Sequence, residues 1–165
     1  MKLNRKGFTL IELLAVVIIL GLVLIIVFPN SIDVFQNAKL KSEKAFLDRL
    51  SQSIDSYTSL NTGNVNFELY REDAKKSGYT SDIIVYKGTI KIEDIINDNI
   101  ITESDYINPS NKNKCEKTAD IEIYKDSDSV YCHKVKKESL GCLTENYKNS
   151  IEDEYAIDTC IWTEE

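Results

Sequence analysis

A long apolar run stands near the start of the chain. From Phe8 to Phe28 only Thr9 and Glu12 are plainly polar. A helix rises ~1.5 Å per residue, so this run would form a helix ~31 Å long. The hydrocarbon core of a bilayer is ~30 Å thick. The pattern therefore predicts one membrane-spanning helix.

Beyond the run, apolar residues follow the period of a half-buried helix. They recur at spacings of three and four with one longer gap: Phe35, Ala38, Phe46, Leu50, Ile54 and Tyr57. Pro29 lies between the two patterns, and we expect it to kink the helix. The first strong stop is Asn61-Thr62-Gly63-Asn64. We therefore expect one helix from about residue 9 to about residue 60.

Shorter elements follow. Residues 65–77 predict a short helix that ends near Ser77-Gly78. Residues 83–86 predict a buried strand that ends at Lys87-Gly88. Residues 89–92 alternate like a strand, and residues 93–96 fit the start of a short helix. These short elements, together with the long helix and the strands described next, indicate an α+β fold.

The best strand signals are residues 121–124 and 130–135, with the turn-rich residues 125–129 between them. They predict an antiparallel hairpin. If Tyr124 faces Val130, then Ile121 faces His133 and Ile123 faces Tyr131. These side chains, with Val135, would share the face of the sheet that packs on the helix. His133 is then a core or edge histidine rather than a metal ligand.

Charge limits the partners and the orientation. The chain has 20 Lys and Arg against 27 Asp and Glu, a net charge of −7. An acidic chain argues against nucleic acid as the main partner. Lys2, Arg5 and Lys6 precede the apolar run, and no basic residue lies in residues 8–32. The positive-inside rule therefore places the N-terminus in the cytoplasm and the rest of the chain outside.

All four cysteines lie in the last third of the chain. In an exported domain, an even number predicts disulfides. The hairpin register places Cys115 roughly 23 Å from Cys132 at ~3.3 Å per residue, which favours Cys115–Cys142 with Cys132–Cys160. The sequential pairing, 115–132 with 142–160, stays open, as do free thiols. No Cys-x-x-Cys pair supports a zinc site.

Catalytic signatures are missing from the sequence. It contains no Gly-rich phosphate loop, no His-Glu-x-x-His and no Gly-x-Ser-x-Gly. A Ser-His-Asp or Cys-His site would have to use His133, and the one nucleophile placed near it is Cys132, which points to the other face of a strand. Asp126-Ser127-Asp128 lacks the spacing of a calcium loop and reads as a turn. We expect no enzyme activity, cofactor or metal.

The segment Lys6-Gly7-Phe8-Thr9-Leu10-Ile11-Glu12, followed by the apolar run, resembles the class III signal of type IV prepilins. The resemblance is strong over Lys6–Asn30 and extends more loosely to about Leu60. It implies that a prepilin peptidase cleaves between Gly7 and Phe8 and that the new terminal Phe8 is N-methylated. It also implies that Glu12 pairs with the terminal amine of a neighbouring subunit.

The chemistry of that pair is consistent. A carboxylate at the centre of a membrane helix costs on the order of 2.5–3.5 kcal/mol, and less near the edge. A free α-amine has a pKa of ~8 and is cationic at neutral pH. The two charges neutralise each other in a low-dielectric bundle. The resemblance further implies that filament packing melts the helix between Gly21 and Pro29.

The organisation expected from pattern and resemblance together is a pilin fold, in which a long helix packs on a small antiparallel sheet. Residues 1–7 are a cleaved cytoplasmic leader, 8–29 the transmembrane or filament-core helix, 30–60 an amphipathic spine, and 61–165 an exported head. A second, weaker resemblance links residues 92–102, followed by Asn108-Pro109, to a segment of Gram-positive pilins and pseudopilins.

The function implied is a structural subunit of a type IV pilus or a related filament, as in twitching motility or adhesion. Its partners would be other pilin copies, the prepilin peptidase and methyltransferase, a membrane platform protein and an assembly ATPase. The subunit would wait in the cytoplasmic membrane and then join a surface filament. The alternatives are a pseudopilin of a secretion or DNA-uptake machine, a minor tip adhesin, and an anchored metal hydrolase around Cys132 and His133.

Overall fold

The computed structural model describes residues 9–76 and 82–163, without the side chains of residues 26–31 and Thr163. The first helix, α1, covers Leu10–Asn61 and continues through Pro29 without a break. The chain divides into two compact units, residues 1–39 and 40–165.

The first unit is the N-terminal part of α1. Its large apolar side chains are exposed on all sides, from Leu10 at 84% to Ile25 at 70%. The expected span, residues 8–28, falls only partly within the described residues. Among those described, no helix contains an apolar stretch long enough to cross a membrane.

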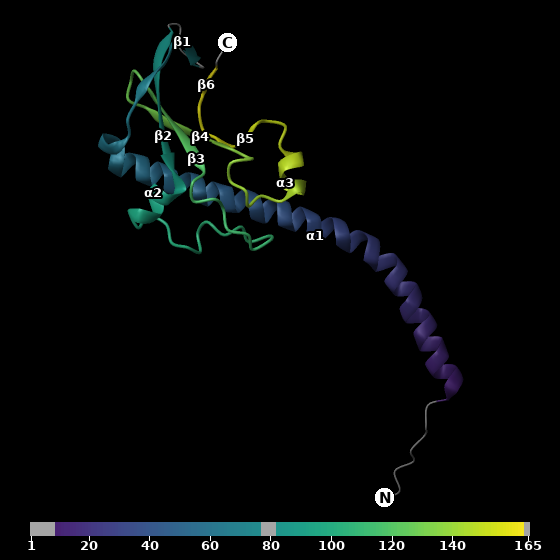
Figure 1. The fold of residues 1–165 in the computed structure, drawn as a ribbon. Helices are drawn as coiled ribbons and strands as arrows, with labels where there is room; N and C mark the ends of the chain where they lie inside the picture. The colour runs from purple at the N-terminus through teal and green to yellow at the C-terminus, as the bar shows by residue number, and fades with distance from the viewer. Residues whose placement is uncertain (1–8, 77–81, 164–165) are drawn as a thin grey trace, which may run out of the picture. The chain divides into compact units, whose positions relative to one another are not determined.

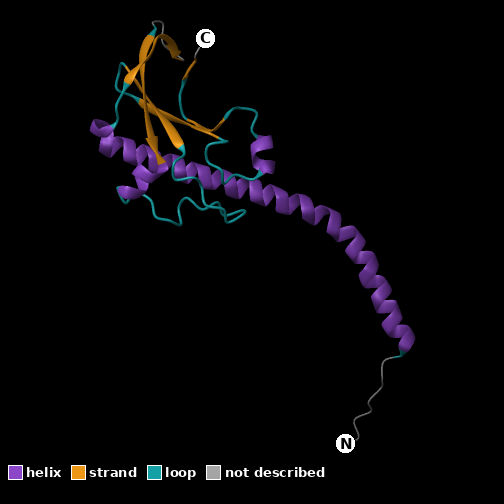
Figure 2. Ribbon diagram, in the orientation of Figure 1, coloured by secondary structure: helices purple, strands orange, loops and turns teal. Residues whose placement is uncertain are grey.

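The second unit combines the C-terminal part of α1 with an antiparallel sheet (Figures 1 and 2). The strands lie in the order β5-β4-β3-β2-β1-β6. Their bounds are β1 Glu68–Lys76, β2 Ile83–Lys91, β3 Asp120–Asp126, β4 Tyr131–Lys136, β5 Tyr155–Asp158 and β6 Trp162–Thr163. The short helices are η1 Thr62–Asn64, α2 Ile92–Asn97 and α3 Glu145–Ser150. The α+β fold expected from the sequence is confirmed.

One core lies between α1 and the sheet. Phe46, Leu50 and Ile54 recur on one face of α1 and are each at most 2% exposed. They belong to the same buried cluster as Ile123 and Val135 on the inner face of the sheet. Burying one such side chain contributes roughly 1.5–3 kcal/mol, so this interface fixes the second half of α1 against the strands.

A second core lies on the outer face of the sheet, away from α1. It contains Ala74, Ile83, Val85, Tyr124 and Trp162. Tyr124 and Trp162 meet edge to face, with ring centroids 5.2 Å apart. The two-residue strand β6 thus anchors the C-terminal segment over the sheet.

The prediction of a helix over residues 65–77 is wrong, because β1 occupies Glu68–Lys76 there. The strand pairs with β2 through two register irregularities. Its last residues are fixed by distant partners: Lys76 pairs with Trp162 of β6, and its ammonium bonds the Asp126 carboxylate of β3. The expected helix end near Ser77-Gly78 lies outside the described residues.

The predicted end of a strand at Lys87-Gly88 is also wrong. β2 runs through both residues to Lys91. Gly88 lies against the chain that enters β1: a Cβ placed on it would stand 2.5 Å from Val65 Cγ1 and 2.9 Å from the Asn66 carbonyl oxygen. The glycine therefore permits the close approach of these two chain segments within the sheet.

The hairpin of β3 and β4 is present, but its register differs by two positions from the expected one. Ile123, not Ile121, faces His133. The cause is Asp126, whose Oδ1 accepts the N–H groups of Asp128 (3.0 Å) and Val130 (2.8 Å). Ser129 adopts a φ of 63°. The result is a three-residue loop, which pairs Asp126 with Val130. A shift of two keeps every side chain on its expected face.

Candidate functional site

Thr9 and Glu12 close the N-terminus of α1. The Thr9 N–H and hydroxyl both donate to Glu12 Oε2, at 2.9 and 2.8 Å. In return the Glu12 N–H donates to Thr9 Oγ1 at 3.3 Å. Because α1 begins at Leu10, Thr9 is the N-cap and Glu12 the third helical residue. This is a capping box, in which two otherwise unpaired helix N–H groups are satisfied.

The cap places a carboxylate where the helix dipole favours negative charge. Its surroundings are apolar, since Leu10 and Ile11 beside it are 84% and 73% exposed and offer only hydrocarbon. The first unit therefore presents one fixed carboxylate at the N-terminal end of an apolar helix. A group that docks on this end meets a carboxylate already oriented by its own helix.

The processing and assembly residues predicted near the N-terminus are only partly within the described residues. Gly7 and Phe8 lie outside the described residues. Gly21 is helical, and nothing lies within 4 Å of the position that a Cβ would take. Pro29 is helical in its backbone, and its side chain is not described. Melting between Gly21 and Pro29 stays a prediction for the filament. Thr9 was missed as a capping residue, although Thr-x-x-Glu ahead of an apolar run is its sequence signature.

The C-terminal region is held by two disulfides. Cys115 bonds Cys142 with their Cα atoms 4.5 Å apart, and Cys132 bonds Cys160 with theirs 5.1 Å apart. This is the pairing that the hairpin register favoured. Cys115 and Cys142 are buried in the core under α1, whereas Cys132 and Cys160 pack against the outer core. Each sheet face thus has one covalent tie.

Two lysines lie buried on the outer face. The Lys76 ammonium is 2.6 Å from Asp126 Oδ2, and both side chains are about one twentieth exposed. Lys134 lies 5.0 Å from the ring centroids of Tyr155 and Trp162, and 3.3 Å from the Asp158 carboxylate. These contacts neutralise the buried cations and fix the C-terminal segment.

Tyr124 lies on the same face of the sheet. Its hydroxyl donates to Glu122 Oε2, and burial together with this hydrogen bond raises the pKa of Tyr124.

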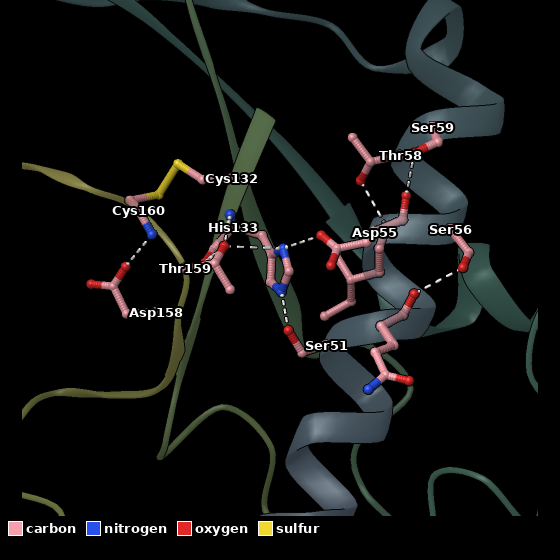
Figure 3. A network of polar contacts seen from close by, with 12 residues as sticks. Ser51, Asp55, Ser56, Thr58, Ser59, Cys132, His133, Asp158, Thr159 and Cys160 are labelled. Carbon is pink, nitrogen blue, oxygen red and sulfur yellow. Dashed lines mark hydrogen bonds and ion pairs between the residues drawn. A yellow bond between two sulfur atoms is a disulfide. The ribbon is translucent and has the colours of Figure 1, made fainter. Parts of the chain in front are cut away.

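His133 has a serine beside it, which the sequence did not indicate. Ser51 Oγ lies 2.8 Å from His133 Nε2, and Asp55 Oδ1 lies 3.2 Å from Nδ1 (Figure 3). The three side chains contact one another in the same succession, Ser to His to Asp, as in a Ser-His-Asp catalytic site. However, Ser51 is in the interior of α1, so its own N–H is bonded within the helix and is not a free oxyanion donor. The arrangement is suited to positioning rather than to acyl transfer.

The alternative of a metal site at Cys132 and His133 can be compared with the side chains around the ring. Among the residues that the structure describes, no group of three or more His, Cys, Asp and Glu could hold a metal ion. Cys132 beside it is disulfide-bonded. Asp126 and Asp128 belong to the hairpin turn described above.

Comparison with known proteins gives one family match. Residues 2–28 match the model of the prokaryotic N-terminal methylation motif. No curated protein and no solved structure matches the chain significantly. The match covers the segment in which Thr9 and Glu12 form the capping box. This motif is the class III signal typical of type IV pilins and pseudopilins, and the long helix packed on an antiparallel sheet is a pilin-like fold. The chain therefore carries an N-terminal methylation motif, and its fold is pilin-like.

Proposed function

We propose that this chain is a structural subunit of a type IV pilus or pilus-like filament, assembled through the N-terminal part of α1. The observation that carries the proposal is a single capped acid, Glu12, on an otherwise apolar and exposed helix directly behind the Gly7-Phe8 junction. The matched motif implies processing by a prepilin peptidase and a helix inserted in the membrane with the remaining domain outside.

Apolar packing supplies the assembly energy. More than a dozen large apolar side chains of Leu10–Ile25 are at least 45% exposed in the single subunit. Moving one such side chain from water to an apolar contact is worth roughly 1.5–3 kcal/mol. A subunit leaving lipid gains less, because lipid is itself apolar, and close packing then drives association. Either way the helices need partners along their whole length.

The charge of Glu12 sets the register between subunits. Cleavage after Gly7 frees an α-amine on Phe8, and methylation leaves its charge in place. A neighbour that docks one turn too high or too low leaves both this amine and the Glu12 carboxylate unpaired in an apolar bundle. Breaking a buried pair costs about 3–5 kcal/mol. The pair therefore selects one stagger from many that are equally apolar.

Electron microscopy of cells with an antibody to residues 40–165 tests the proposal. Labelled filaments, lost when Gly7→Leu blocks processing, are the expected result. Two results together would favour a pseudopilin instead. The processed protein would stay in the membrane fraction, and cells that lack it would lose secretion or DNA uptake. Protein that is neither processed nor assembled in its own host would contradict both readings.

A further inference from the structure

His133 lies where three segments of the second unit meet. It stands on the inner face of β4 and is 1% exposed. Ser51 and Asp55 reach it from α1, and Thr159 reaches it from the segment that follows β5 (Figure 3). Ser51 is 82 positions and Thr159 26 positions away in sequence. One imidazole therefore joins the long helix, the sheet and the C-terminal segment.

The hydrogen bonds suit a neutral ring. The Thr159 hydroxyl donates to the His133 carbonyl oxygen at 3.2 Å and accepts the His133 N–H at 2.8 Å. Nδ1 then carries the ring proton and donates to Asp55 Oδ1, while Nε2 accepts from the Ser51 hydroxyl. Every polar atom of the ring has a partner in this form. A second proton, on Nε2, makes Nε2 the donor and Ser51 Oγ the acceptor. The Ser51 hydroxyl then loses the acceptor for its own proton.

Two carboxylates influence the charge of the ring. Asp55 on α1 is 63% exposed, and Asp158 at the end of β5 is 39% exposed and engaged by Lys134. Burial lowers the pKa of His133, and the two carboxylates oppose it. Both carboxylates are partly in solvent, so water screens their attraction. The strand opposite contributes Ile123, which is apolar.

We propose that His133 is an acid-sensitive latch, which joins α1 to β4 and the C-terminal segment when neutral and loosens α1 when protonated. The Cys132–Cys160 disulfide ties the C-terminal segment to β4 at any pH. What protonation weakens is therefore the docking of α1 on the sheet. This inference stands on the described contacts and does not depend on the proposed function.

The sign of the pH effect follows from proton binding. An unfolded histidine has a pKa of ~6.5, and in the folded chain burial holds the pKa of His133 below that value. Between the two values the unfolded state binds more protons, so the free energy of unfolding falls as the pH falls. The full stability is present above ~6.5. Each pKa unit of difference lowers the folded-to-unfolded ratio up to about tenfold.

The chain provides one histidine and one tryptophan as probes. The full chain in detergent micelles is titrated by NMR, following the ring protons of His133. Thermal unfolding is followed in parallel through the fluorescence of Trp162, which is 7% exposed. The latch predicts titration below ~6.5 and a lower melting temperature at pH ~5 than at pH ~7.5.

Variants separate this histidine from other acid effects. Asp55→Asn removes the nearer opposing carboxylate, so the His133 titration should move further down and the acid loss should grow. Asp33→Asn, which changes an exposed carboxylate on the same helix 22 residues before Asp55, is the matched control and should leave the titration unchanged. His133→Gln should remove most of the loss between pH ~7.5 and ~5. A His133 titration at or above ~6.5, or an equal acid loss in His133→Gln, overturns the proposal. If His133→Gln does not fold, the shift in Asp55→Asn decides.

Discussion

Glu12 Oε2 accepts both the backbone N–H and the hydroxyl of Thr9, so the acid proposed to meet a neighbour's amine is already engaged in its own helix. The capping box orients the carboxylate before any partner arrives. It also keeps the charge satisfied at the edge of an apolar helix. Glu12 thus has two separable tasks, helix capping through its oxygen atoms and subunit pairing through its charge.

The two tasks predict different results for two substitutions. Glu12→Gln keeps an oxygen that can accept from Thr9, because Gln also serves in capping boxes, but it removes the charge. Glu12→Ala removes both. We expect normal cleavage in each variant, and filament yield to fall severely in both. Hydrogen exchange at the start of α1 should speed up only in Glu12→Ala, where a lost cap costs about 0.5–2 kcal/mol.

Mature mass and filament yield from the same cells provide the measurement. Thr9→Ser is the control for the cap, because it keeps the hydroxyl. Wild-type filament yield from Glu12→Gln would show that the charge is not needed for assembly.

The buried ion pair of the outer face gives a second prediction. Lys76→Met leaves the Asp126 carboxylate buried without its cation, and removal of one partner of such a pair costs about 3–5 kcal/mol. Lys75→Met is the matched control. Lys75 pairs with Asp82, and its side chain is 61% exposed, so the free energy of unfolding should change by less than about 1 kcal/mol. Denaturant unfolding followed by Trp162 fluorescence measures both. Equal effects at the two lysines would refute the buried role.

Gly88 tests the close approach of β2 to the segment before β1. Gly88→Ala places a Cβ 2.5 Å from Val65 Cγ1 and 2.9 Å from a backbone oxygen. We expect a loss of about 1–3 kcal/mol in unfolding free energy from overpacking. Gly63→Ala is the control, since nothing lies within 4 Å of its Cβ position. A Gly88→Ala protein as stable as the control would show that this part of the sheet shifts freely.

The two disulfides predict a difference between loops of nearly equal length, with sequence separations of 27 and 28. Loop entropy alone assigns each about 3.5 kcal/mol. Cys115 and Cys142 are at most 3% exposed, so serine there also buries a hydroxyl. The double Cys115→Ser, Cys142→Ser variant should therefore lose more unfolding free energy than Cys132→Ser, Cys160→Ser. Melting temperatures of the two variants, in the reverse order, would contradict this.

The sequence predicted what depends on local pattern. The apolar period through Tyr57 and the stop after Leu60 define α1, which ends at Asn61. The turn residues after Tyr124 define the hairpin. Its register was two positions off because the loop length depends on Asp126 accepting two N–H groups, and a turn-rich run allows several such loops.

What the sequence did not predict depends on distant partners. β1 is rich in charged residues and carries no clear strand period, and it is a strand because β2, β6 and Asp126 hold it. The contact of Ser51 with His133 joins positions 82 residues apart. No short-range pattern marks either. Thr9 is different, because the Thr-x-x-Glu spacing ahead of an apolar run marks a capping box in the sequence itself.

The mass of the N-terminal peptide, measured on protein purified from its own cells, tests whether subunits pair through Glu12 and a newly made amine. Assembly through Glu12 needs a new amine, so the peptide should begin at Phe8 and carry one added methyl group. A peptide that still contains Gly7 and the residues before it, in protein recovered from filaments, would contradict the account.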